Sequence, residues 1–322
     1  MRLDQAIAIA KGAATHLPFA YSLFGQKRMT AGGVAANYCY GVWFKHLLLL
    51  NEIARCGVPG VVAELGPGDT VGVGVVALLS GAQRYIGVDA RPFAATGANI
   101  AIAASLVRMF QDREPLNPSG WPDFRHLLDS DGFPSTLLTE EALSASLARD
   151  RLGAISSAVR QVFAGGRSDL IVYSAPLSDP SLIEAGTVDL VLSHSVLEHV
   201  VDLQDVIANS FRWLRPGGYA SHQFDLTSHG IVRDWDGHRE FGRRAWDMVV
   251  GTRPFMINRL PYSAVVDTFT RCGFRLPRND RLRRATTVPR SALCRDWREV
   301  SDDDLETSGG YVVAQKPQML AA

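Results

Sequence analysis

Cysteine is scarce in this sequence, and long apolar runs are missing. The four cysteines stand far apart with no CxxC spacing, which argues against a disulfide framework or a zinc knuckle and suits a reducing compartment. Residues 1–18 carry Asp4 and Lys11 within their apolar part, unlike the core of a signal peptide. No stretch approaches the roughly 18 apolar residues that a membrane-spanning helix needs. We therefore predict a cytoplasmic protein without a membrane span.

An excess of either charge is also missing. The formal net charge is zero, and no NPPY or DPPY tetrad follows the predicted fourth strand, so we expect no nucleic acid partner. The charge is nevertheless uneven, because residues 271–298 hold nine arginines against only Asp280 and Asp296. This cluster indicates either an acceptor that carries phosphate, uronate or sulfate, or simply a solvated face.

Apolar runs alternate with helical patterns along the chain. Short continuous apolar runs indicate strands that are buried on both faces, as in a parallel sheet. The pattern predicts a doubly wound α/β fold with additions around it. Strands are expected at 61–65, 85–89, 169–176, 188–195, 219–226 and 309–317, and helices at 70–81, 93–110, 197–214, 262–274 and after Thr139, with a tight turn at 215–218.

The glycine loop ELGPGD after the first strand does not fit a phosphate ligand. Val71 takes the third glycine position of the GxGxxG dinucleotide fingerprint, and no GKS or GKT follows. The carboxylates of Glu64 and Asp69 would repel a phosphate and attract a cation. Asp89, which ends the second strand, is placed to accept both hydroxyls of a ribose. These residues predict a nucleoside ligand with an ammonium or sulfonium group.

Four motifs in order carry a family resemblance. The segments ELGPG (64–68), GVDA (87–90), VDLVLSHSVLEHV (188–200) and LRPGG (214–218) resemble class I S-adenosylmethionine-dependent methyltransferases of the type 11/12 kind. The resemblance implies S-adenosylmethionine as cofactor and a seven-stranded, mostly parallel, Rossmann-like sheet. It also implies a helical N-terminal cap over residues 1–60 and a methyltransferase domain over 61–322. The insertions 113–168 and 227–300 would form the acceptor side.

Further segments, among them 38–50, 221–230 and 258–263, look like a bacterial methyltransferase subgroup associated with surface-polysaccharide gene sets. This second resemblance implies a saccharide-type hydroxyl as the methyl acceptor. The acceptor would be a small molecule or glycan, and the arginine cluster leaves an anionic one open. The sequence gives no indication of an oligomeric state.

The family resemblance also implies a set of cofactor-binding residues. Some would lie beside the methionine and ribose parts, others beside the adenine, and the backbone after the fourth strand would pass the methionine part. Many relatives carry an acid at the end of the third strand, where this sequence has Ser174. The implied residues are Glu64, Gly66, Pro67, Gly68, Asp69, Asp89, Ala90, Arg91, Ser174, Ala175, Ser193 and His194.

Five of the eight histidines fall between residues 194 and 238, where an acceptor would meet the methyl group. An alcohol acceptor must lose a proton, so a histidine near its ordinary pKa suits a general base. We predict His222 in this role, then His199, with Glu198 beside it. The alternative is a divalent metal, which we do not favour.

The metal alternative comes from SVLEHV, which resembles the ExxEH motif of metal-dependent methyltransferases. Ser195 takes the place of the first glutamate of that motif, so Glu198, His199 and His222 would make only a partial site. A second possible ligand set is His222, Asp225 and His229.

Four aromatic residues of the insertions could stack on sugar faces or simply pack, namely Trp235, Trp246, Tyr262 and Trp297. Tyr38 and Tyr40 could close over the cofactor. We predict an O-methyltransferase. The alternatives are an N-methyltransferase or one acting on a lipid or quinone, a catalytically silent S-adenosylmethionine-binding partner, and an NAD(P)-dependent oxidoreductase.

Overall fold

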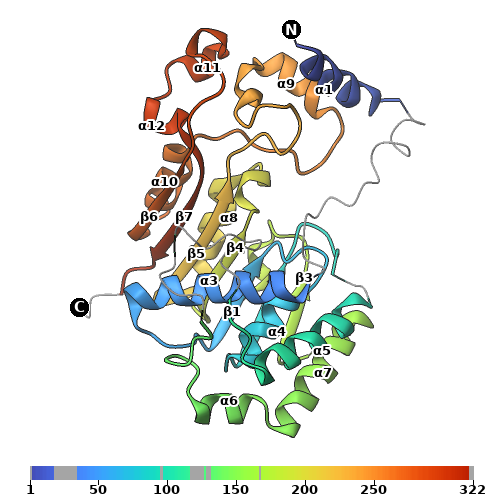
Figure 1. Cartoon of the computed structure of the whole chain (residues 1–322), viewed down its shortest axis with the longest axis vertical. Coiled ribbons are helices and arrows are strands. Elements are labelled where there is room, and N and C mark those ends of the chain that lie inside the picture. Colours follow the sequence, from blue (N-terminus) through green and yellow to red (C-terminus); the bar gives the residue numbers. More distant parts are fainter. Residues whose placement is uncertain are drawn as a thin grey trace.

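A seven-stranded sheet forms the centre of the molecule in the computed structural model (Figure 1). Neighbouring strands are parallel except at β7, which is antiparallel to both β5 and β6. The predicted doubly wound, mostly parallel sheet is therefore confirmed. The strand order is β3-β2-β1-β4-β5-β7-β6, with β1 Val61–Leu65, β2 Arg84–Val88, β3 Ile171–Ser174, β4 Val188–His194, β5 Leu214–Asp225, β6 Arg275–Arg283 and β7 Thr307–Gln315. The structure describes residues 2–17, 35–94, 97–116, 127, 132–166 and 168–318.

Two apolar cores sandwich the sheet, which is why its central strands are continuous apolar runs. Successive residues of β1 point to opposite faces, so Val62 packs with α3, α4, α5 and α7, whereas Ala63 packs with α8 and α10. The same alternation sends Glu64 toward the first of these faces. The helices are α3 Ala36–Ala54, α4 Gly72–Leu79, α5 Ala98–Gln111, α7 Arg149–Phe163, α8 Leu203–Trp213 and α10 Tyr262–Arg271. Among the described residues, no helix combines the length and apolar character needed to cross a membrane.

Strand β6 lies within the arginine cluster, and the sequence pattern had assigned no strand to these residues. Its side chains alternate between exposed and partly buried, because β6 is the edge strand of the sheet. Charged side chains suit such an edge, since they discourage pairing with another chain. The expected turn at 215–218 is likewise part of strand β5, with Gly217 at a φ of 79°.

The described part of insertion 113–168 does not lie on the acceptor side. Helix α6 (Glu140–Ser146) begins at Thr139, whose hydroxyl accepts the Ala142 amide at 3.3 Å, as predicted. Helix α7 follows and packs against α5 and β3, so it is the ordinary crossover between β2 and β3. The Arg151 guanidinium donates to the carbonyls of Leu78 and Ala82 after α4, away from the carboxyl ends of the strands.

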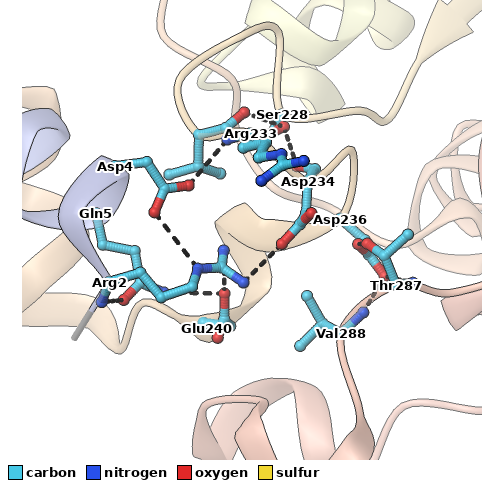
Figure 2. Close-up of polar contacts among 11 residues, drawn as sticks. Arg2, Asp4, Gln5, Ser228, Arg233, Asp234, Asp236, Glu240, Thr287 and Val288 are labelled. Carbon is cyan, nitrogen blue, oxygen red and sulfur yellow. Dashed lines mark hydrogen bonds and ion pairs between the residues drawn. The ribbon is translucent and has the colours of Figure 1, made fainter.

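A separate lobe stands at the opposite end of the molecule from α6 and α7 (Figure 1). Helix α1 (Leu3–Ala14) packs there against α9 (Arg243–Val250), so the expected cap over 1–60 is divided between this lobe and α3 on the sheet. Figure 2 shows how polar contacts fix α1: Arg2 pairs with Asp234 at 2.6 Å and with Glu240 at 2.7 Å. The remaining short elements are η1 Pro180–Leu182, η2 Leu197–His199, η3 Gly237–Glu240, η4 Arg290–Ala292, α11 Arg295–Arg298 and α12 Asp302–Leu305.

Candidate functional site

A cavity of about 680 Å³ lies at the carboxyl ends of β1, β2 and β4, where open α/β sheets bind their ligands. This volume falls within the roughly 300–1,000 Å³ typical of small-molecule sites. Of the residues implied for cofactor binding, those that line the cavity are Glu64, Gly66, Pro67, Gly68, Asp89, Ala90 and His194. Those that do not are Asp69, Arg91, Ser174, Ala175 and Ser193; beyond β3 the wall is instead made by Pro176, Leu177 and Ser178.

The glycine loop turns sharply around the end of β1. Gly66 and Gly68 adopt φ angles of 66° and 71°, a left-handed conformation that favours glycine. The Gly66 amide donates to the Val88 carbonyl at 2.8 Å. A Cβ atom on Gly66 would stand 2.7 Å from Cγ2 of Val196, so the loop passes too close to the segment after β4 for any larger residue.

Asp89 is fixed by the loop that it faces. Its carboxylate accepts the Gly68 amide at 2.9 Å and the Ala90 amide at 2.7 Å, while only 5 % of the residue is exposed. Burial raises the pKa of Asp89 from its usual value, against the lowering effect of these amides. The carboxylate therefore has a set orientation in the cavity wall, as recognition of ribose hydroxyls requires.

Glu64 is the second acid in the wall and is 4 % exposed. The Tyr85 hydroxyl donates to its Oε2 at 2.5 Å, and burial raises the pKa of Glu64 to about 8. A buried carboxyl group of this kind favours ionisation only when a cation stands beside it. The expected pair of loop carboxylates is thus reduced to Glu64, because Asp69 does not line the cavity.

The segment after β4 is a tight 3₁₀ turn rather than the start of a long helix. The expected helix 197–214 divides into η2, which carries Glu198 and His199, and α8. Asn258 holds the turn: its side-chain amide donates to the carbonyls of Leu197 and Val200, both at 2.9 Å. The backbone amide of Asn258 also donates to the Glu198 carbonyl at 2.7 Å.

His222 does not lie where a general base is needed, which corrects the leading catalytic prediction. Alternation along β5 points Ser221 toward α3 and His222 toward α10, where its ring packs at 5.3 Å from that of Phe269. His222 is fully buried, shares a hydrogen bond of 2.8 Å with Ser193 and does not line the cavity. Burial lowers its pKa to about 3. A position within the strand could not reveal which face the side chain takes.

His194 and His199 do line the cavity. His194 is buried with its ring 6.0 Å from that of Tyr38, and burial lowers its pKa well below the usual value. Burial and the neighbouring His229 lower the pKa of His199 to about 4. Tyr38 lines the cavity, whereas Tyr40 does not and is buried with its hydroxyl donating to the Glu114 carbonyl at 2.6 Å.

Four polar side chains lie close together beside the cavity: Glu198, His199, Asp225 and His229. The rings of His199 and His229 are perpendicular with centroids 5.0 Å apart. His229 Nε2 lies 3.6 Å from Asp225 Oδ2 and 3.9 Å from Glu198 Oε1. Both metal-ligand sets considered from the sequence contained His222, which lies apart from this cluster; His229 stands beside Glu198 and His199 instead.

Unusual backbone conformations gather in the same wall. Ser195, His229 and Phe255 all line the cavity and have positive φ angles of 54°, 49° and 60°. Such conformations cost of order 1–3 kcal/mol each in a non-glycine residue and concentrate at functional sites. Neither Ser195 nor Phe255 could be recognised as a strained position from the sequence, because residue types without a preference for positive φ stand there.

Of the two alternatives for Trp235, Trp246, Tyr262 and Trp297, the structure favours packing, because none of them lines the cavity. The four aromatic residues are buried and packed against guanidinium groups: Arg239 lies 4.7 Å from the ring of Trp235, Arg259 4.8 Å from Trp246 and Arg281 4.2 Å from Tyr262. The ring of Trp297 lies 4.8 Å from the same Arg239. Packing therefore accounts for all four, and the rings that do line the cavity are Tyr38, Phe93 and Phe255.

The arginine cluster is also separate from the cavity. Its members pair with acids of neighbouring elements, such as Arg278 with Glu52 at 2.6 Å and Arg281 with Asp304 at 2.7 Å. Among the described residues, no arginine or lysine lines the cavity, and its charged groups are acids and histidines. The described lining of the cavity thus holds no guanidinium or ammonium group for an anionic acceptor.

Comparison with known proteins gives a family match over part of the chain. Residues 153–221, which run from α7 into β5, match the model of a family described as a methyltransferase domain. A search of curated proteins finds no match.

Solved structures of methyltransferases are similar to the chain at a low level. An S-adenosylmethionine-dependent methyltransferase from Listeria monocytogenes is 12 % identical, with 85 % of this chain and 99 % of that one covered and a TM-score of 0.42. The phosphoethanolamine N-methyltransferase 2 of Haemonchus contortus, in complex with S-adenosyl-L-methionine, is 12 % identical, with coverages of 92 % and 60 % and a TM-score of 0.42. A chain of the Haloferax volcanii complex of the Trm112 activator with a methyltransferase is 13 % identical, with coverages of 89 % and 96 % and a TM-score of 0.41. Similarity at this level says nothing about the acceptor.

Proposed function

We propose that this chain is a class I S-adenosylmethionine-dependent methyltransferase whose acceptor group is a hydroxyl of a polar small molecule; the family match over residues 153–221 and the seven-stranded sheet support the family. The observation that carries this proposal is one cavity with two chemically different sides. The glycine loop and Asp89 line one side. His199, Asp225 and His229 line the other.

The cofactor side matches the charge of S-adenosylmethionine. Its wall contains the acids Glu64 and Asp89 and, among the described residues, no cation that would bind a pyrophosphate. We infer that Asp89 binds the ribose and Glu64 the positively charged methionine part, which the position of both residues in the cavity wall supports. The same arrangement disfavours a dinucleotide cofactor, since its phosphates would face two carboxyl groups.

The acceptor side supplies groups that bind a hydroxyl and take its proton. In the reaction the acceptor oxygen forms a bond to the methyl carbon while the carbon–sulfur bond breaks. The electron pair of that bond stays on sulfur, which yields S-adenosylhomocysteine, and the hydroxyl proton passes to the cluster around Asp225 and His229. An amine acceptor would not need this cluster of proton acceptors to the same degree.

The acceptor is inferred to be neutral and smaller than a polysaccharide chain. The cavity lacks the cationic groups that would hold phosphate or uronate, and the aromatic rings suited to stacking on sugars are in the cores. Resemblance to the polysaccharide-associated subgroup remains a prediction. The acceptor side is formed by the ends of β4 and β5 and by segment 227–260.

A matched pair of variants tests this function. We expect His199→Asn to lower turnover about 10²-fold or more, because it disrupts the cluster that takes the hydroxyl proton, and positioned proton transfer contributes 10²–10⁴-fold. His222→Asn should retain turnover per folded molecule, since the amide can replace the contact with Ser193 outside the cavity. The measurement is S-adenosylhomocysteine release with a panel of polyols, phenols and hydroxy acids, alongside calorimetric binding of S-adenosylhomocysteine.

Three results would contradict the proposal. Methyl transfer to amines with no transfer to any hydroxyl would rule out a hydroxyl as the acceptor group. Cofactor binding without turnover on any acceptor would favour a silent binding partner. Equal turnover in the wild type and the His199→Asn variant would remove the proposed role of the acceptor-side cluster.

A further inference from the structure

Glu198, His199 and His229 form a cluster with the character of a metal site. Glu198 and His199 come from η2, and His229 comes from the segment that follows β5. One ligand atom from each of the three side chains lies within 4.8 Å of the other two. His199 and His229 also line the cavity, so a group bound among them would be accessible to the acceptor.

Two buried atoms of this cluster have no hydrogen-bond partner. Glu198 is only 3 % exposed, its Oε1 accepts the Asp225 amide at 3.2 Å, and its Oε2 is without a partner. His199 Nδ1 is also buried without a partner. Burying a polar atom without a partner is costly, so a buried carboxylate oxygen and an imidazole nitrogen left in this way point to a ligand that accepts their lone pairs.

The backbone around the cluster holds its members in place. Asn258 binds three carbonyls of the η2 region, and the Asp225 amide fixes one oxygen of Glu198. His229 occupies a strained backbone position with a φ of 49°. An unfavourable backbone conformation is thus maintained at His229, as is common where a side chain has a function.

We propose that Glu198, His199 and His229 bind a divalent transition-metal ion that in turn binds the acceptor hydroxyl. This inference rests on the proposed function, because it assigns the group that activates the hydroxyl. Three protein ligands with open positions are the usual arrangement of a catalytic metal site. A set of one carboxylate and two imidazoles suits Mn²⁺, Co²⁺ or Zn²⁺ better than Mg²⁺, which prefers oxygen ligands.

The spacing of the ligands fits such an ion after a small closure. Metal–ligand bonds of about 2.0–2.2 Å place neighbouring ligand atoms roughly 3–3.5 Å apart. His229 Nε2 is now 3.9 Å from Glu198 Oε1. Rotations of the side chains by a few tenths of an ångström to about 1 Å would complete the site, a change that metal binding commonly drives.

The ion would weaken the O–H bond of the acceptor. With the oxygen bound to the metal, its proton passes to the Asp225 carboxylate, which lies beside His229 at 3.6 Å. The oxygen then attacks the methyl carbon, and the electrons of the carbon–sulfur bond remain on sulfur. No oxidant or reductant takes part, and the charge lost by the sulfonium is balanced by the released proton.

Titration with Co²⁺ tests the site directly, through the visible absorption of the bound ion. We expect one equivalent to bind to the wild-type protein, and at least 10-fold weaker binding in Glu198→Gln and in His229→Gln. His16→Gln is the matched control, because it removes an exposed histidine of the α1 region and should leave the titration unchanged. Binding of S-adenosylhomocysteine by each variant shows that it is folded.

The outcomes separate this inference from the proposed function. Co²⁺ binding that is absent, or equal in the wild type and both ligand variants, overturns the metal site. If hydroxyl methylation then continues after exhaustive treatment with EDTA, the proposed function stands without the metal. If Co²⁺ binds as expected but every hydroxyl acceptor is inert, the metal site stands and the proposed function fails.

Discussion

The two sides of the cavity are built in different ways. The cofactor side is assembled from consecutive strand ends, where the Asp89 carboxylate binds the amides of Gly68 and Ala90 directly. The acceptor side brings together residues from three separate segments, around Glu198, His229 and Phe255. Asn258 joins the Phe255 segment to the Glu198 segment.

Support for the acceptor side also comes from the opposite end of the sequence. The Arg233 amide donates to the Asp4 carboxylate at 3.0 Å, and Arg2 pairs with Asp234 and Glu240 (Figure 2). Asp234 follows His229 by five positions in the same segment. Helix α1 therefore stabilises the segment that carries an acceptor-side residue, whereas the Asp89 carboxylate is held by amides of the adjoining loops. We therefore expect single substitutions on the cofactor side to reduce cofactor affinity strongly. Substitutions in helix α1 should have smaller effects on stability and turnover.

The largest expected effect is on the cofactor side. Asp89→Ala removes the acceptor of two backbone amides and the candidate ribose ligand, so affinity for S-adenosylhomocysteine should fall at least 100-fold, or about 3 kcal/mol. Calorimetric titration measures the change. Asp112→Ala, at an exposed position after α5, serves as the control and should bind normally. Unchanged affinity in Asp89→Ala would mean that the cofactor lies elsewhere.

An intermediate effect concerns pH. Glu64 has a pKa of about 8 in the free protein, and a cationic methionine group would favour its ionised form. Binding then releases a proton below pH 8, so affinity for S-adenosylhomocysteine should rise from pH 6 to pH 8, by at most tenfold per pH unit, and then level off. Glu64→Gln should flatten this profile. Wild-type affinity that is independent of pH would show that Glu64 does not face the cation.

The same pKa has a consequence for the stability of the free protein. In the folded protein the pKa of Glu64 lies above the ordinary 4.5. Its contribution to the free energy of unfolding is therefore complete below pH 4.5 and is lost as the pH rises through about 8. Bound S-adenosylhomocysteine should reduce that loss. Thermal unfolding at pH 6 and pH 8, with and without the ligand, checks the sign.

The smallest expected effect is at helix α1. Arg2 is partly exposed, and salt bridges of this kind contribute about 1 kcal/mol or less. Arg2→Ala should therefore lower the melting temperature by roughly 2–4 °C. It should reduce turnover only slightly and leave affinity for S-adenosylhomocysteine unchanged. Lys11→Ala, at an exposed position of the same helix, is the control. A loss of cofactor affinity in Arg2→Ala would contradict the separation of the two sides.

Much of the cofactor side could be predicted because its residues follow the strands that position them. Glu64, Gly66, Gly68 and Asp89 stand at fixed intervals from apolar runs, and the parallel sheet brings the ends of those runs to one edge. The strand runs themselves were recognisable because strands buried on both faces are apolar throughout. β6 escaped detection because an edge strand rich in arginine has no such signature.

The sequence by itself determined most of the sheet, the glycine loop and the position of Asp89 at the end of β2, because local spacing and strand polarity are enough to place them. Only the tertiary structure decided that His222 points into the α10 core while His229 joins Glu198 and His199. Side chains of adjacent strand residues face opposite sides of the sheet, and a segment after a strand can fold back in many directions. The acceptor side is therefore set by long-range packing, through Asn258 and helix α1, and not by spacing along the chain.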